Sequence, residues 1–134
     1  MSAARPLLRV VLAFAMIGIG ILHFLSPEPF TKIVPAWLPA ARTLVLVSGV
    51  FEILGGAGLL VPQTRRWASY GLVALYVAVF PANVNMAVNH ISIGDAPMPT
   101  WALWARLPFQ ILFIVWALWV GRSDAPRGRA RTAA

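Results

Sequence analysis

Apolar residues fall in four long runs along the chain, and the short connections between them together with the termini hold most of the prolines and charged residues. The runs cover residues 7–25, 43–61, 67–87 and 101–120. Each is close to the roughly 20 residues that a helix needs to cross the hydrocarbon core of a bilayer. A spanning segment must satisfy its own backbone hydrogen bonds, which favours helices. The pattern predicts an all-α fold, an integral membrane four-helix bundle that forms one domain over residues 1–120.

A shorter pattern occupies the connection between the first two runs. Its apolar residues recur at helical spacing, at Phe30, Ile33, Val34, Trp37 and Leu38. Prolines at 27, 29, 35 and 39 limit any helix there to a turn or two. We expect a short interfacial segment across the outer mouth of the bundle. Anchoring the connection is the simpler role for this segment, and a lid over the bundle is the alternative.

Composition and charge agree with a membrane protein and suggest its orientation. The chain is 60% hydrophobic and 11% charged, with a mean hydropathy of +0.78, which is too apolar for a soluble domain of this size. If both termini are cytoplasmic, the inner side holds eight arginines, and the outer connections hold only Lys32 and Arg42. The eight are Arg5, Arg9, Arg65, Arg66, Arg122, Arg127, Arg129 and Arg131.

This distribution satisfies the positive-inside rule. The net charge of +7 is therefore a topology signal, and no nucleic-acid partner is expected. We expect a multi-pass protein of the cell (inner) membrane whose first partner is the lipid bilayer. The first run lacks a following small-residue cleavage site and is interpreted as an uncleaved helix. Residues 121–134 are expected to form a basic, disordered cytoplasmic tail.

Polar residues inside the runs are confined to the outer half of the predicted membrane. With 1.5 Å of rise per residue, His23 lies about 4 Å from the outer end of its helix, Arg106 about 8 Å, Asn83 about 10 Å and Glu52 about 14 Å. Gln110 shares a helical face with Arg106. Small residues flank Glu52, so another helix can approach it closely.

We expect Glu52 to meet Arg106 across the core, because an unpaired charge at that depth costs at least about 2.5 to 3.5 kcal/mol. Each polar residue also has a structural interpretation. Asn83 can bond a neighbouring helix, His23 can sit half in water, and a Glu52–Arg106 pair can simply fix helix register.

Several ordered motifs resemble a known family. "GILHF", "VPAWLP", "SGVFEILGGAGLL", "FPANVNMA" and "WARLPFQ" together are similar to the DoxX-like family of small four-span bacterial membrane proteins, over about residues 10 to 120. The resemblance implies a four-helix bundle and, for some relatives, an association with quinone-linked or thiol redox machinery. It places the family's His, Glu and Asn on His23, Glu52 and Asn83. The family's Arg-Leu-Pro falls on residues 106–108.

One departure bears on function. The chain has no cysteine, so it cannot run a dithiol relay itself, and a quinone or another subunit would have to carry electrons. No metal is expected, because the two histidines lie on different helices without ligand spacing.

Two functions follow as hypotheses, and whether the chain is an enzyme stays open. The first is a quinone- or small-ligand-binding subunit of a membrane redox system, working with a membrane or periplasmic redox protein. Its candidate ligand-binding or proton-transfer residues are His23, Glu52, Asn83, Arg106 and Gln110. Arg106 and Gln110 would hold a carbonyl, and Glu52 or His23 would move its proton. The second is a non-catalytic membrane scaffold or assembly partner with a structural polar core. A homo-oligomer is compatible with either.

Overall fold

The computed structural model describes residues 3–93 and 96–124, and within these ranges the chain is all-helical, with no strand. The five helices are α1 (Ala4–Leu25), α2 (Glu28–Thr31), α3 (Ala41–Leu60), α4 (Arg65–Val88) and α5 (Thr100–Val120).

The four long helices are each long and apolar enough to cross a membrane, which confirms the four predicted runs. The largest difference in bounds is at the first, which starts at Ala4 instead of Leu7. Helices extend slightly beyond the apolar runs because a helical turn satisfies backbone groups in the polar flanks as well.

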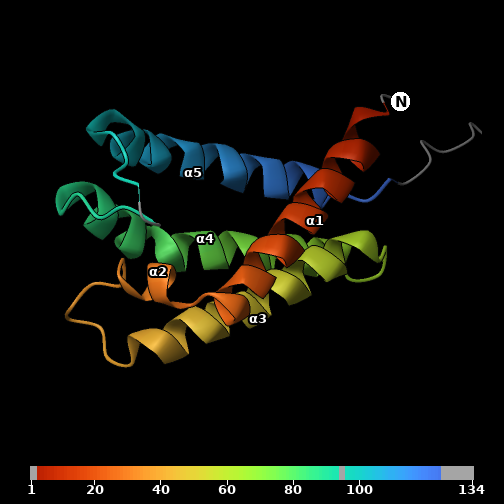
Figure 1. Cartoon of the computed structure of the whole chain (residues 1–134). Coiled ribbons are helices and arrows are strands. Elements are labelled where there is room, and N and C mark those ends of the chain that lie inside the picture. Colours follow the sequence, from red (N-terminus) through yellow and green to blue (C-terminus); the bar gives the residue numbers. More distant parts are fainter. Residues whose placement is uncertain (1–2, 94–95, 125–134) are drawn as a thin grey trace, which may run out of the picture.

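The long helices form an up-down bundle in which neighbours along the chain are neighbours in space (Figure 1). α1 packs on α3, α3 on α4, and α4 on α5. The short turn at residues 61–64 makes α3 and α4 antiparallel partners, as predicted. α1 and α5 touch where the chain begins and ends, and they spread apart toward the other end. We call these the termini end and the α2 end.

Close packing of α1 on α3 depends on small residues. A Cβ placed on Gly49 would lie 2.8 Å from the His23 Cβ and 2.9 Å from the Gly20 carbonyl oxygen. A Cβ on Gly56 would lie 2.6 Å from the Ala13 carbonyl oxygen. These glycines confirm that a helix approaches closely beside Glu52, and they turn the Glu52 side chain toward α1.

Apolar side chains form two buried clusters at different heights in the bundle. The cluster nearer the termini end includes Leu12, Leu59 and Leu72. The cluster at the α2 end includes Met86 and Leu103. Many other large apolar side chains point outward and are exposed, as expected for helices that face lipid.

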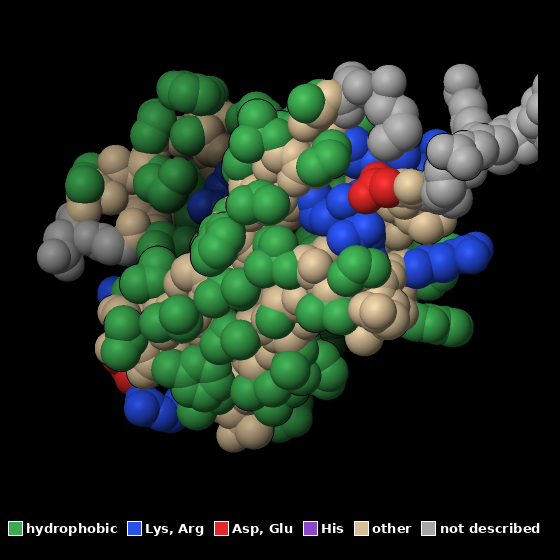
Figure 2. Space-filling model, turned by 90° about the vertical axis from the view of Figure 1, so that its right-hand side faces the viewer, with side chains coloured by type: hydrophobic (Ala, Val, Ile, Leu, Met, Phe, Trp, Pro, Cys, Tyr) green, Lys and Arg blue, Asp and Glu red, His purple; other side chains and the backbone are tan. Residues whose placement is uncertain are grey.

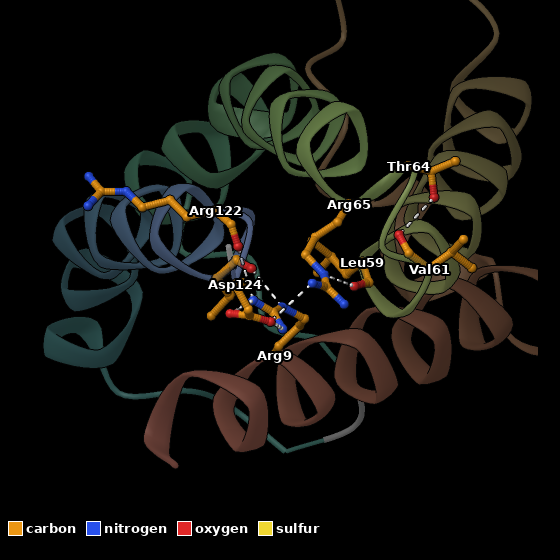
Figure 3. A network of polar contacts seen from close by, with 8 residues as sticks. Arg9, Leu59, Val61, Thr64, Arg65, Arg122 and Asp124 are labelled. Carbon is orange, nitrogen blue, oxygen red and sulfur yellow. Dashed lines mark hydrogen bonds and ion pairs between the residues drawn. The ribbon is translucent and has the colours of Figure 1, made fainter. Parts of the chain in front are cut away.

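A polar cluster closes the termini end (Figures 2 and 3). Arg9 is 4% exposed. Its Nη1 and Nη2 donate to the Asp124 carboxylate at 2.7 and 3.1 Å, and its Nε donates to the Val120 carbonyl at 2.7 Å. Arg65 donates through Nη1 to Asp124 at 3.2 Å and through Nε to the Leu59 carbonyl at 3.0 Å. The start of α1, the α3–α4 turn and the end of α5 are thereby joined.

The expected disordered tail falls mostly outside the described residues, which end at Asp124. Of the predicted tail, Gly121 is buried, and Asp124 makes the contacts just given. These first residues therefore belong to the packed bundle.

Candidate functional site

A single large cavity of about 830 Å³ contains all five residues predicted for the site. All five helices contribute to its wall, which is mostly apolar. The wall includes Met16, Leu75 and Tyr76 of the cluster nearer the termini end and Ile33 of the cluster at the α2 end. The predicted polar residues in the wall are His23, Glu52, Asn83, Arg106 and Gln110.

Glu52 lies beside His23, on the α1–α3 side of the cavity. The Glu52 Oε2 is 3.1 Å from His23 Nδ1. The same nitrogen is 2.8 Å from the Ile19 carbonyl oxygen, and a ring nitrogen carries at most one hydrogen. The Glu52 Oε2 accordingly has no hydrogen bond among the described residues, although Glu52 is only 9% exposed. A buried carboxylate oxygen is left with capacity for a donor that a ligand can supply.

Phe30 completes this side of the site. Its ring stacks on the His23 ring with centroids 4.0 Å apart and planes at 17°. Phe30 lies in α2, which is only four residues long, and the apolar stripe continues beyond it in turns. Within the stripe, Ile33, Val34 and Leu38 also line the cavity, whereas Trp37 is 74% exposed.

Asn85 ties this segment to α4, because its Nδ2 donates to the Ile33 carbonyl at 2.9 Å. The stripe is therefore part of the cavity wall. This position fits a lid over the bundle as well as an anchor for the connection.

Asn83 and Gln110 form the opposite polar side, between α4 and α5. The Asn83 Nδ2 donates to Gln110 Oε1 at 2.5 Å, and Gln110 Nε2 donates to the Tyr76 carbonyl. The Tyr76 hydroxyl reaches across to α1 and donates to the Met16 sulfur at 3.2 Å. The carboxamide of Gln110 is thus held in place, and one of its two N–H groups remains for a ligand.

Arg106 has no hydrogen bond or ion pair with any described residue, and it is half-buried in the cavity wall. The predicted direct pair between Glu52 and Arg106 is wrong: Glu52 contacts His23 instead. The glycine contacts turn Glu52 toward α1, and α1 and α5 diverge at this height (Figure 1). The two side chains consequently share the cavity without touching.

Sequence reasoning did not assign Phe30 or Asn85 to the site. The signals were weak. Phe30 starts the short apolar stripe, and Asn85 lies two residues after Asn83 on another helical face. Only the path of the connection after α1 brings Phe30 onto the His23 ring and the Ile33 carbonyl within reach of Asn85.

Comparison with known families covers almost the whole bundle. A family model described as "Domain of unknown function (DUF8561)" matches residues 12–121. The chain belongs to this family. The DUF8561 match includes every residue that lines the cavity, from Met16 to Phe113. No curated protein and no solved structure matches the chain.

Within residues 3–93 and 96–124, no three His, Asp or Glu side chains gather in a group that could hold a metal ion. The donors in the cavity wall suit an organic ligand with a polar head better than a cation.

Proposed function

We propose that this chain is a DoxX-like membrane protein that binds a lipophilic molecule with a carbonyl head, best represented by a quinone, as a subunit of a membrane redox system. The observation that carries the proposal is the cavity itself. It has an apolar wall, and neither the buried Glu52 Oε2 nor the Arg106 guanidinium makes a hydrogen bond with another residue that the structure describes. Its volume of about 830 Å³ lies in the range of small-molecule sites.

A quinone head suits these groups. Arg106 and the remaining N–H of Gln110 can donate to one carbonyl oxygen. The Glu52 and His23 pair can give a proton to, or take one from, an oxygen of the ring. Phe30, Phe109 and Phe113 supply aromatic surface in the wall. The chain has no cysteine, so a membrane or periplasmic redox partner would supply or remove the electrons.

Location and orientation belong to the same proposal. We place the chain in the cell (inner) membrane with both termini cytoplasmic, because the positive residues gather at the termini end. Tags fused to either terminus should be inaccessible to an impermeant label in intact cells. Labelling of a terminus from outside would invert the orientation and place the cavity in the inner half of the membrane.

The ligand is tested by purifying the full chain in mild detergent and measuring bound quinone by mass spectrometry. The matched variants are Ala78→Phe and Ala74→Phe, one turn apart on α4. Ala78 lines the cavity, and Ala74 is an exposed residue outside its wall. We expect roughly one quinone per chain in the unchanged protein and in Ala74→Phe. Ala78→Phe should lose most of it.

Recovery of phospholipid alone, or equal quinone in both variants, contradicts the proposal. The alternative, a membrane scaffold with a structural polar core, is favoured by the bonds that Asn83, Gln110 and Tyr76 make among themselves. For a scaffold, Ala78→Phe should leave both the bound lipids and any partner protein unchanged.

A further inference from the structure

A second, smaller cavity of about 380 Å³ lies at the termini end, between the start of α4 and the end of α5. It is separate from the quinone site and more polar. Arg66, Ser69 and Tyr70 line it from α4, and Arg122 and Ser123 line it from the segment after α5. Leu118 provides its apolar edge. Two guanidinium groups thus face one groove from two elements.

The charges at this end are unbalanced. Asp124 is bonded to Arg9 and Arg65, and Arg5 lies over the Trp119 ring with its Cζ 5.3 Å from the ring centroid. Arg66 and Arg122 have no carboxylate partner among the described residues. Figure 3 shows the Arg122 side chain directed away from Asp124. Its backbone carbonyl accepts from Arg9 at 3.1 Å, which fixes the position from which it extends.

Arg66 is also held in position. Its Nε donates to the Tyr70 hydroxyl at 3.1 Å, and its Cζ lies 5.8 Å from the Tyr70 ring centroid. The two Nη groups are left to donate outward. The groove wall keeps its shape because Ser69 Oγ donates to the Ala117 carbonyl at 2.7 Å. A Cβ on Gly121 would clash with the Ser69 side chain, so the end of α5 lies close against α4 here.

We infer that this groove binds the phosphate of an anionic phospholipid. Guanidinium groups match phosphate oxygens in charge and geometry, and basic pockets between membrane helices are suited to anionic head groups. A lipid fits better than a free anion because the groove continues onto apolar surface. Trp67 packs with its ring edge-on to Tyr70 of the groove wall and is 75% exposed, and Leu118 at the groove edge is 39% exposed. Acyl chains can lie on these side chains.

The test uses the full chain in detergent micelles that contain either phosphatidylglycerol or phosphatidylcholine, with the thermal midpoint as the readout. Inorganic phosphate is a third condition. Phosphatidylglycerol should raise the midpoint above that in phosphatidylcholine, since a ligand of the folded state stabilises it. Inorganic phosphate should give no comparable rise.

Arg66→Gln and Arg122→Gln each remove one positive group from an exposed position, so the fold should survive. If each arginine contributes about 1 kcal/mol to the free energy of lipid binding, the phosphatidylglycerol concentration that gives half of the rise in thermal midpoint should increase about fivefold in each variant. It should increase roughly 30-fold in the double variant. Lys32→Gln removes one exposed charge at the α2 end and should change nothing.

The midpoint in phosphatidylcholine reports whether each variant is folded. An unchanged phosphatidylglycerol response in the double variant overturns the inference. So does an equally large weakening of that response in Lys32→Gln. Equal stabilisation by inorganic phosphate overturns the lipid assignment. The quinone content of these variants should stay normal, which separates this site from the proposed function.

Discussion

The Glu52 side chain is a buried carboxylate with few polar partners. It lies near the middle of α3 with His23 as its close polar neighbour, and its buried Oε2 accepts no hydrogen bond from the described part of the chain. Burial of a carboxylate with so few partners costs free energy. A group placed at such a cost is better explained by a ligand than by stability alone.

Glu52→Gln tests that explanation. The change removes the cost of burying the carboxylate, so the thermal midpoint in detergent should stay the same or rise. The quinone content, measured with the ligand reduced to its quinol, should fall, since a carboxamide oxygen accepts a hydrogen bond from the quinol hydroxyl less strongly than a carboxylate does. A lower midpoint with unchanged quinone content would mean that Glu52 serves only the fold.

Gln110 should contribute to stability, in contrast to Glu52. Gln110→Leu leaves the Asn83 side chain and the Tyr76 carbonyl without their partner. Loss of these buried bonds should lower the free energy of unfolding by about 1 to 3 kcal/mol. Asn89→Ala is the control, because it removes an exposed bond to Asn85 and should cost less than about 0.5 kcal/mol. Chemical denaturation in detergent gives both values, and equal losses would contradict the prediction.

At the scale of helices, the α1–α3 contact leaves no space for an added methyl group at Gly49. Gly49→Ala places a methyl group 2.8 Å from the His23 Cβ, and the helices must separate to admit it. We expect a loss of about 1 to 3 kcal/mol. Gly18→Ala adds the same methyl group on α1 where no atom lies within 4 Å, so stability should be kept or improved.

Chemical denaturation of Gly49→Ala and Gly18→Ala in detergent measures the change in stability of each variant. If Gly49→Ala is as stable as Gly18→Ala, close helix approach is not what this glycine provides. Quinone content should also fall in Gly49→Ala, because movement of α3 displaces both Glu52 and His23.

The helices themselves were predictable, because bilayer thickness fixes the length of an apolar run. The inward direction of Glu52 also followed from the glycines beside it. Its partner did not, since the rotation of α1 and the divergence of α1 from α5 depend on packing over the whole bundle. The role of Phe30 depends on the path of a proline-rich connection, which residue spacing does not specify. Arg9 was taken only as a marker of orientation, and its burial depends on Asp124, 115 residues away.

At the scale of the whole molecule, Asp124 holds the termini end together. The hydrogen bond from Arg9, followed by the charges of Arg9 and Arg65, lowers the pKa of this carboxyl below its ordinary 3.8. A lowered pKa in the folded state means that the ionised form adds stability above about pH 4. That contribution is lost as the pH falls through the lower folded-state value.

Asp124→Asn should therefore be less stable than the unchanged chain at pH 7, and the difference should shrink below about pH 4. Thermal midpoints of both proteins at pH 7 and pH 3 provide the measurement. Glu28→Gln removes an ion pair with Arg42 whose side chains are 71% and 65% exposed, and it should have little effect at pH 7. A difference between Asp124→Asn and the unchanged chain that does not vary with pH would contradict the assignment.

The Asp124 carboxylate also determines the order in which contacts between the helices can form during synthesis. Arg9 is synthesised 115 residues before Asp124, and Arg65 is synthesised 59 residues before it. The hairpins of α1 with α3 and of α3 with α4 can assemble during synthesis, but both arginines lack their counter-charge until the residues that follow α5 have been made. Joining of α1 to α5 is thus a late step of folding, and a chain truncated before Asp124 would lack the carboxylate that ties α1, the α3–α4 turn and the end of α5 together.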